Sequence, residues 1–253
     1  MKLDIPVAHV ESGLRSFDRT MPEEINRVLT DQISDWCFTH SAEAEDNLVR
    51  EGVPRDRVHF VGNTMIDTLV KLRRRIDASD AVTRLGLEPQ RYVLVTLHRP
   101  KLVDGALFPR ALDALGRLAQ DLPVVFPLHP RSRARLPEAA GAPDLHLIDP
   151  VGYVDFLALE AQAAAVVTDS GGVQEETTFL RVPCFTLREN TERPVTVSHG
   201  TNRLLGLDVD AVVGVPRLIE RPHVPLTPPP GWDGHAAERL VDVLLPALAE
   251  AAA

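Results

Sequence analysis

The sequence predicts an α/β protein built on parallel β-sheets, and three observations support this class. Short apolar runs rich in β-branched residues alternate along the chain with segments of helical period, as in successive βα units. The apolar runs are continuous, which is expected of strands that helices cover on both faces. Two such series follow one another, with a turn at Gly62-Asn63-Thr64 between them. We therefore expect two α/β layers with a hinge near Gly62.

The first series runs from the N-terminus to this turn. Pro22 suits the first turn of a helix, and Glu23 and Glu24 behind it suit the positive end of the helix dipole. This series is too short to close a doubly wound domain and corresponds to the last part of one. Its expected elements are a buried strand (5–10), a helix (22–32), a strand (36–38), a helix ended by Gly52 (42–51) and a strand (58–61).

The second series begins with a helix from Met65 onward and contains most of the expected strands. After them, the Pro-rich stretch 222–230 is typical of a linker, and 236–248 has the pattern of an amphipathic helix. The apolar runs that we expect to form buried strands are 92–97, 124–128, 145–148, 165–168 and 184–187.

Composition narrows the class of protein. The chain has 253 residues and a formal net charge of −9, which does not favour a nucleic-acid-binding surface. No apolar run approaches the roughly eighteen residues of a membrane helix, and Asp4 and Pro6 interrupt the region where a signal peptide would be apolar. Cys37 and Cys184 each lie in an apolar stretch, as core cysteines do. We expect a cytoplasmic, reducing location and no membrane partner.

A small-residue turn gives the sharpest local signal for chemistry. Ser170, Gly171 and Gly172 follow an expected strand and open a helix, so their backbone N–H groups can approach a phosphate at the helix N-terminus. Glu176 lies about a turn and a half further on, where a carboxylate can accept hydrogen bonds from both hydroxyls of a ribose. A Ser-Gly-Gly turn can also be only a tight connection, but the following acid favours the phosphate interpretation.

Cationic side chains occur where other strands end. His98 and Arg99 follow one expected strand, and His129 with Arg131 follows the next. Arg193 belongs to a charged loop after a third strand. A lone histidine is more often structural and a charged loop is more often only solvated. In a doubly wound sheet, however, loops at the carboxyl ends of strands form the ligand crevice, which favours a polyanion site.

Two carboxylates near the start are candidates for proton transfer. Glu11 lies in the turn after the first expected strand, and Glu23 begins the next helix. Acids at one cleft edge are suited to general acid/base work. A helix-capping acid and a surface acid would give the same pattern, and these residues alone do not separate the two interpretations.

Taken together, these motifs resemble a known family. In order along the chain they match the signatures of non-hydrolysing UDP-N-acetylglucosamine (UDP-GlcNAc) 2-epimerases. Each piece is weak, but the ordered set covers nearly the whole chain. The matching segments are 9–15 (HVESGLR), 21–27 (MPEEINR), 62–67 (GNTMID), 96–100 (TLHRP), 168–176 (TDSGGVQEE), 191–194 (TERP), 200–204 (GTNRL) and 232–239 (WDGHAAER).

The resemblance implies the glycosyltransferase-B architecture, in which two Rossmann-like domains face a cleft. Residues 1–62 would then be the last part of the first domain, 63–230 the complete UDP-binding domain, and 231–253 a crossover helix that returns to the first domain. The family's opening Gly-Thr-Arg-Pro-Glu loop and a catalytic Asp late in its first domain have no counterpart here. What is absent on this reading is of order a hundred residues.

The resemblance also implies a reaction and roles for residues. Members interconvert UDP-GlcNAc and UDP-N-acetylmannosamine at C2 by eliminating UDP and adding it back, without metal or other cofactor. The resemblance implies acid/base catalysis by Glu11 and Glu23, and it places His98 by the diphosphate or glycosidic oxygen. It implies that Ser170 and Gly171 bind phosphate, that Glu176 binds the ribose, that Phe156 contacts uracil and that Arg193 binds the diphosphate region. Arg99 and Gly172 would also bind substrate, and His129 would belong to an allosteric site.

Other functions stay open at this point. A UDP-sugar-binding fragment without catalysis, a hydrolysing epimerase that releases N-acetylmannosamine and UDP, and a glycosyltransferase share some of these motifs. An active epimerase would need the rest of its first domain, supplied by another polypeptide or an upstream start codon. We also expect an incomplete first domain to self-associate through exposed apolar surface and strand edges, while a homodimer stays possible.

Overall fold

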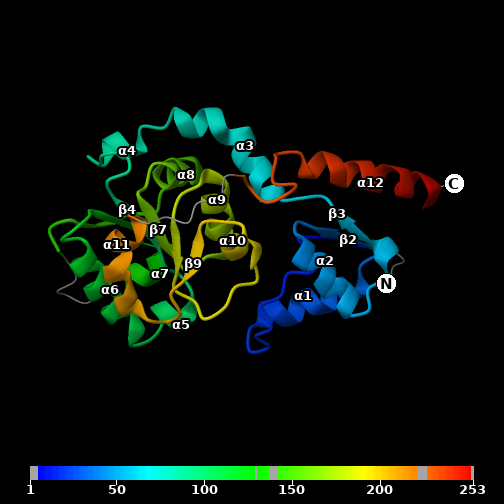
Figure 1. Ribbon diagram of the computed structural model, residues 1–253, viewed down its shortest axis with the longest axis horizontal. Coiled ribbons are helices and arrows are strands. Elements are labelled where there is room, and N and C mark those ends of the chain that lie inside the picture. Colours follow the sequence, from blue (N-terminus) through cyan, green and yellow to red (C-terminus); the bar gives the residue numbers. More distant parts are fainter. Residues whose placement is uncertain (1–4, 129, 137–141, 221–226, 252–253) are drawn as a thin grey trace. The chain divides into compact units, whose positions relative to one another are not determined.

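The computed structural model describes residues 5–128, 130–136, 142–220 and 227–251, which form two compact units (Figure 1). Unit 1 takes in the described residues of Met1–Lys71, Thr191–Ser198 and Thr227–Ala253, and unit 2 those of Leu72–Asn190 and His199–Leu226. Helix α3 (Thr64–Asp77) connects them. Each unit is built around its own parallel sheet.

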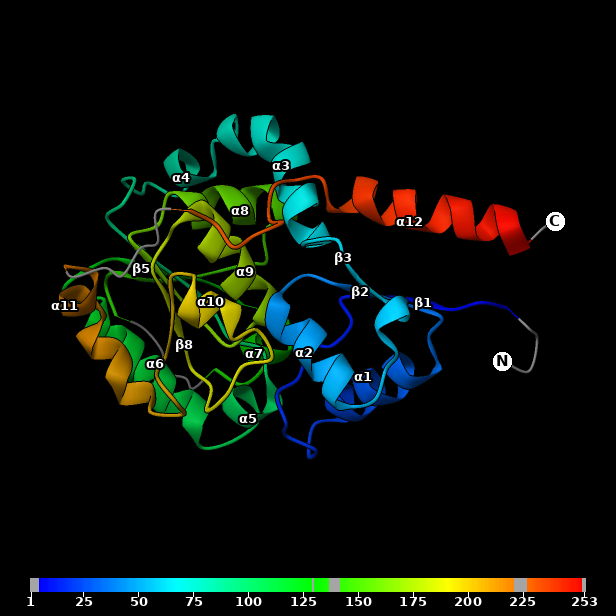
Figure 2. The same cartoon turned by 45° about the vertical axis from the view of Figure 1, so that its right-hand side comes forward.

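Unit 1 contains a three-stranded parallel sheet in the order β1-β2-β3 (Figure 2). The register pairs Ala8 with Trp36 and Cys37 with Val58. Helix α2 packs against β2 and β3. The unit's elements are β1 (Ala8–Val10), α1 (Pro22–Ile33), β2 (Trp36–Thr39), α2 (Ala42–Arg50), η1 (Arg55–Arg57), β3 (Val58–Phe60), α10 (Val195–Ser198) and α12 (Ala236–Ala251).

The expectation of a buried strand over 5–10 is wrong. The strand begins at Ala8, and Ile5 and Val10 are 62% and 41% exposed. Within the described residues β1 pairs only with β2, so it forms an edge of the sheet and lacks a neighbour on its other side. The other expected strands are confirmed to within one residue at each end.

The C-terminal helix of unit 1 is anchored by contacts with segments far away in the sequence. The Asp67 carboxylate accepts the backbone N–H groups of Ala236 and Ala237 at 3.0 and 2.6 Å, which caps the start of α12. Trp232 is 1% exposed and donates its indole N–H to the His40 carbonyl at 3.0 Å. These bonds attach α12 to the start of α3 and to the segment after β2.

Unit 2 contains a six-stranded sheet, all parallel, in the order β6-β5-β4-β7-β8-β9. The chain moves outward from β4 to β6, returns to β7 beside β4, and moves outward the other way. This reversal places the topological switch point between β4 and β7. The strands are β4 (Val93–Thr96), β5 (Val124–Pro127), β6 (Leu145–Ile148), β7 (Ala165–Thr168), β8 (Cys184–Thr186) and β9 (Asn202–Leu204).

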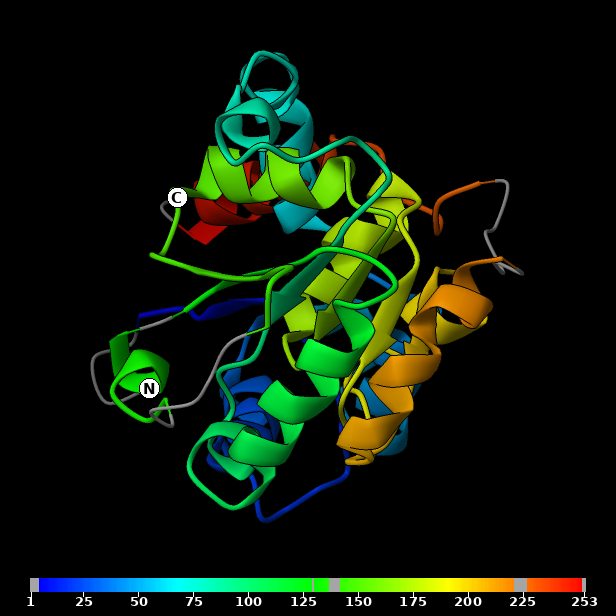
Figure 3. The same ribbon diagram turned by 90° about the vertical axis from the view of Figure 1, so that its left-hand side faces the viewer.

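Helices cover both faces of this sheet (Figure 3). Val93 and Val95 belong to one buried cluster, while Tyr92 and Leu94 belong to the other, because side chains alternate along a strand. The first cluster includes residues of α5 (Pro100–Val103), α6 (Leu107–Leu118), η2 (Val209–Gly214) and α11 (Val215–Ile219), and the second includes residues of α4 (Ala81–Arg84), α8 (Tyr153–Ala161) and α9 (Gly171–Leu180). Helix α7 (Pro130–Arg133) follows β5.

Both cysteines are core residues, as predicted. Cys37 and Cys184 are fully buried and unpaired. Burial raises the pKa of the Cys184 thiol to about 12 and also raises that of Cys37, so neither is primed as a thiolate. None of the helices in the described part of the chain has the length and hydrophobicity that crossing a bilayer requires.

Candidate active site

The β7–α9 connection has the strand–turn–helix form that the sequence predicted. Strand β7 ends at Thr168 and α9 begins at Gly171, with Ser170 at the N-cap position. The Ser170 N–H donates to Oγ1 of Thr168 at 2.9 Å, which closes the turn tightly. The turn lies at the carboxyl end of β7, next to the switch point, where doubly wound sheets bind ligands.

Asp169 joins this turn to the loop after β4. Its fully buried carboxylate accepts the backbone N–H of His98 at 3.0 Å and that of Arg99 at 2.7 Å, and lies 3.0 Å from Nδ1 of His98. The Arg99 side chain in turn donates Nε–H to the Asp169 carbonyl at 2.9 Å. Asp169 was not among the predicted site residues, although its position directly before Ser170 is a usable signal.

Glu176 projects from α9 toward α8. It is 3% exposed, and the Tyr153 hydroxyl donates to its Oε1 at 2.7 Å. Burial raises the pKa of the Glu176 carboxyl. Phe156 lies on the same helix as Tyr153, half-buried against the adjoining core cluster.

A series of hydrogen bonds between buried amide and hydroxyl groups supports the start of α9. Gln174 donates to the Ser170 carbonyl at 3.1 Å and accepts from the Asn202 amide at 2.9 Å. Asn202 accepts from the Thr186 hydroxyl at 2.6 Å. Side-chain bonds from β8 and β9 therefore hold the turn at Ser170, although β9 was not predicted from the sequence.

In unit 1 the structure brings together two predicted residues, Glu11 and Arg193. Glu11 directly follows β1 with φ of 64°, a left-handed conformation that few residues other than glycine adopt. Its Oε2 lies 3.5 Å from Nη2 of Arg193, which is 8% exposed. Arg193 Nη1 also pairs with Glu192 at 2.9 Å, and Arg27 lies 3.7 Å from Glu192. Strain of this kind is concentrated at functional sites.

The adjacent acids Glu23 and Glu24 have different environments in α1. Glu23 is exposed, whereas Glu24 is 2% exposed. Glu24 accepts the backbone N–H groups of Ser16 and Phe17, each at 2.9 Å, together with the Ser16 hydroxyl. Glu24 therefore anchors the loop before α1, and Glu23 keeps its carboxylate accessible.

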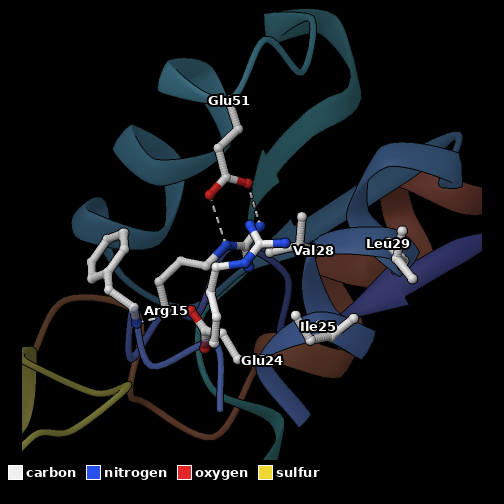
Figure 4. Close-up of a pocket in the computed structure, with 8 residues that line it drawn as sticks. Arg15, Glu24, Ile25, Val28, Leu29 and Glu51 are labelled. Carbon is white, nitrogen blue, oxygen red and sulfur yellow. Dashed lines mark hydrogen bonds and ion pairs between the residues drawn. The ribbon is translucent and has the colours of Figure 1, made fainter. Parts of the chain in front are cut away.

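A buried ionic network holds the loop that contains Glu11. Asp31 is 1% exposed and contacts Nδ1 of His9 at 2.5 Å and Nη2 of Arg15 at 2.6 Å. Burial opposes ionisation of Asp31, but hydrogen bonds with His9 and Arg15 hold its pKa below the ordinary value. Arg15 also makes two bonds to Glu51, at 2.9 and 2.6 Å (Figure 4).

Figure 4 shows the pocket that adjoins this network, where Arg15 meets the apolar side of α1. The bonds between Arg15 and Glu51, which both line the pocket, hold this part of its wall in place. None of the predicted catalytic residues lines this pocket; the lining residues are Arg15, Phe17, Arg19, Glu24, Ile25, Val28, Leu29 and Glu51.

The motifs and both sheets match one family over nearly the whole chain. Residues 1–245 match the UDP-N-acetylglucosamine 2-epimerase family. The chain belongs to this family. This match confirms the resemblance found in the sequence. Epimerases are isomerases, so the chain is a member of an enzyme family.

Three known proteins show how close the relationship is. A UDP-N-acetylglucosamine 2-epimerase of Methanocaldococcus jannaschii is 40% identical over 260 residues, covering 96% of this chain and 69% of the relative. A UDP-2,3-diacetamido-2,3-dideoxy-D-glucuronate 2-epimerase of Pseudomonas aeruginosa is 41% identical over 217 residues, covering 84% of this chain and 60% of the relative. The crystal structure of the Methanocaldococcus jannaschii enzyme in complex with UDP-GlcNAc and UDP matches with a TM-score of 0.84 at 38% identity, covering 96% of this chain and 70% of that one.

This similarity confirms the predicted fold class, an α/β protein of glycosyltransferase-B type with parallel sheets. The predicted site residues are divided between unit 1 and unit 2. Their roles remain predictions. His129 lies outside the described residues, so its placement and any allosteric role also stay predictions. Unit 1 contains Glu11, Glu23 and Arg193, and unit 2 contains His98, Arg99, Phe156, Ser170, Gly171, Gly172 and Glu176.

Proposed function

We propose that this chain interconverts UDP-GlcNAc and UDP-N-acetylmannosamine by epimerisation at C2, through elimination and re-addition of UDP. The observation that carries the proposal is the turn at Ser170 followed by the buried acid Glu176, in a chain that belongs to the 2-epimerase family. A phosphate-type turn with a ribose-type acid accounts for a nucleotide ligand, and the family accounts for the reaction.

Unit 2 supplies the nucleotide contacts in this proposal. The backbone N–H groups of Ser170, Gly171 and Gly172 meet the phosphates at the N-terminus of α9, where the helix dipole favours negative charge. Glu176 accepts hydrogen bonds from the ribose hydroxyls, and Phe156 contacts uracil. Arg99, tied to Asp169 through its Nε, neutralises phosphate charge.

The chemistry requires a base and an acid on opposite faces of the sugar. A carboxylate removes the C2 proton, the C–H electrons form the C1–C2 double bond, and the C1–O bond breaks so that its electrons leave with UDP. Adding the proton to the other face of C2 while a UDP oxygen re-forms the bond to C1 gives the epimer. Glu11 and Glu23 carry out these transfers.

Cations stabilise the diphosphate as it leaves. We assign this part to His98 and Arg193. His98 is oriented by Asp169 at 3.0 Å, and Arg193 is oriented by Glu192 at 2.9 Å and lies 3.5 Å from Glu11.

Incubation of the chain with UDP-GlcNAc in D2O, followed by proton NMR, tests the proposal. Deuterium at C2 and the appearance of UDP-N-acetylmannosamine are expected, and both should be lost in Glu11→Gln. The exposed Asp121→Asn variant serves as the matched control. Free N-acetylmannosamine with UDP would instead indicate a hydrolysing enzyme.

Two further outcomes of the same experiment separate the remaining functions. Saturation transfer to uridine protons without deuterium exchange would indicate a binding protein without catalysis. A parallel sample with UDP-2,3-diacetamido-2,3-dideoxy-D-glucuronate addresses the substrate named for the Pseudomonas aeruginosa relative. Exchange in that sample alone would overturn the assigned sugar but retain the reaction.

A further inference from the structure

Glu160 in α8 is a fully buried acid that the proposed reaction does not use. Its side chain is 0% exposed. Among the residues that the structure describes, no hydrogen-bond donor reaches either of its carboxylate oxygens. A buried carboxylate without a donor is very unfavourable, so this side chain is expected to hold a proton.

The neighbour of Glu160 is the proposed ribose ligand, Glu176. Tyr153, Phe156 and Glu160 are spaced at i, i+3 and i+7 along α8, so they share one face of that helix. Helix α8 packs on α9, the helix that presents Glu176. Tyr153 donates to Oε1 of Glu176 at 2.7 Å, and the Glu160 carboxyl interacts with the Glu176 carboxyl.

The surroundings of the two acids decide where a shared proton lies. Burial raises the pKa of Glu160 well above its ordinary value, and the nearby Glu176 charge raises it further. Burial also raises the pKa of Glu176, but hydrogen bonds from Tyr153 and Glu160 act in the opposite direction. Two adjacent buried carboxyls cannot both ionise at low cost, so the proton stays on Glu160 and the charge on Glu176.

We propose that Glu160 is a positioning residue for nucleotide binding: it stays protonated, donates a hydrogen bond to Glu176, and together with Tyr153 fixes that carboxylate for the ribose hydroxyls. This role rests on the proposed function, because it assumes that Glu176 binds ribose. Glu160 itself is too deeply buried to touch the ligand.

The arrangement gives UDP affinity a defined pH dependence. Glu176 must be ionised to accept from both ribose hydroxyls, so affinity falls as pH drops through its pKa. Removing the donor on Glu160 raises that pKa and moves the loss of affinity to higher pH. The other titratable groups that act on the pair are Tyr153 of α8, Glu175 of α9 and Cys184 of β8.

Calorimetric titration of the whole chain with UDP across a pH series tests this role. Glu160→Met keeps the volume but removes the donor, and should weaken binding about tenfold or more at neutral pH, as loss of a hydrogen bond to a charged group does. Glu160→Gln retains an N–H donor and should bind within about threefold of the wild type. Tyr153→Phe, which removes the other donor, should move the pH profile in the same direction as Glu160→Met.

Asp155→Asn is the matched control, because Asp155 lies on the same helix but pairs with Ser79 and Arg84 instead of Glu176. It should leave UDP affinity and its pH profile unchanged. Wild-type affinity in Glu160→Met, or equal weakening in Glu160→Met and Glu160→Gln, would overturn the positioning role.

A second readout needs no ligand and separates this role from the proposed function. Carbon-13 NMR of glutamate carboxyls should show one protonated side chain at neutral pH, absent from Glu160→Gln and present in Asp155→Asn. A fully ionised set of glutamates would overturn the proposal. If the wild type shows the protonated acid but binds no UDP, the nucleotide-binding function and the positioning role are both wrong. Only the conclusion that Glu160 is protonated would then remain.

Discussion

Oδ1 of Asp169 lies 3.0 Å from Nδ1 of His98, and the same carboxylate accepts the backbone N–H groups of His98 and Arg99. One fully buried side chain therefore positions both the ring and the main chain of the loop after β4. With Nδ1 held by Asp169, Nε2 is the ring nitrogen left for a ligand, and the ring is 53% exposed.

Asp169→Asn should damage both stability and function. The amide would present a donor to N–H groups that now meet a carboxylate, which costs about 1–3 kcal/mol for each buried group left unsatisfied. We expect a lower urea midpoint and a large fall in kcat for epimerisation. Asp121→Asn, at an exposed site, should change neither. An Asp169→Asn enzyme with wild-type kcat would remove His98 orientation from the mechanism.

Gly13→Ala should destabilise unit 1 severely. Gly13 has φ of 78°, and an added Cβ would lie 2.2 Å from the Ala44 carbonyl oxygen. Gly52 supplies the matched comparison, since its φ is 86° but no atom lies within 4 Å of an added Cβ. Gly52→Ala should cost about 1–2 kcal/mol from the left-handed backbone alone, and Gly13→Ala clearly more. Equal urea midpoints for the two variants would contradict the close packing at Gly13.

The neighbouring acids of α1 should respond in opposite ways to the same substitution. Glu23 is exposed, so Glu23→Gln should keep the unfolding midpoint but reduce kcat, by about 100-fold or more if it transfers the proton. Glu24 accepts three hydrogen bonds from Ser16 and Phe17, so Glu24→Gln should lower the midpoint. Thermal melts and deuterium exchange at C2 measure the two effects on the same samples. A stability loss in Glu23→Gln would contradict its accessible position.

The buried acid Glu160 predicts a pH-dependent stability. Its pKa is raised in the folded chain, so its contribution is fully present below the unfolded pKa of about 4.3 and is lost as pH rises through the folded value. Glu160→Gln removes this loss, so its stability relative to the wild type should increase as the pH rises above the unfolded pKa. Urea unfolding at several pH values measures the difference.

Asp155→Asn provides the control for that series. Hydrogen bonds from Ser79 and Arg84 hold the pKa of Asp155 below its ordinary value, so it stays ionised throughout this pH range. Its difference from the wild type should therefore be constant. A constant difference for Glu160→Gln as well would show that Glu160 is ionised in the folded chain.

The apolar surface of unit 1 predicts self-association. Phe17 and Leu29 are 69% and 60% exposed and line the same pocket beside α1. Exposed apolar side chains gathered in this way favour contact with a second apolar surface. Sedimentation velocity at increasing concentration should show association that Leu29→Glu reduces. Leu245→Glu, at a 63% exposed position outside the pocket, should reduce it less. A concentration-independent monomer would contradict this prediction.

Local pattern was sufficient for the fold class and for most strands, because continuous β-branched runs and helix starts report burial without knowledge of partners. It failed at two of the edge strands, β1 and β9. β9 has only one apolar residue in Asn202-Arg203-Leu204, and β1 has the composition of a buried strand although the structure leaves Val10 41% exposed. Edge position depends on which strands pair, and pairing is not a local property.

The sequence by itself determined the turn at Ser170, the acid at Glu176 and the family. Only the tertiary structure decided that Asp169 orients His98, that Glu24 is buried while Glu23 is exposed, and that Glu160 is buried in α8 where this helix packs on α9. The physical reason is that charge, burial and proton sharing depend on which helix faces and strand ends meet in space. Residues far apart in the chain meet there, and no local pattern records their distance.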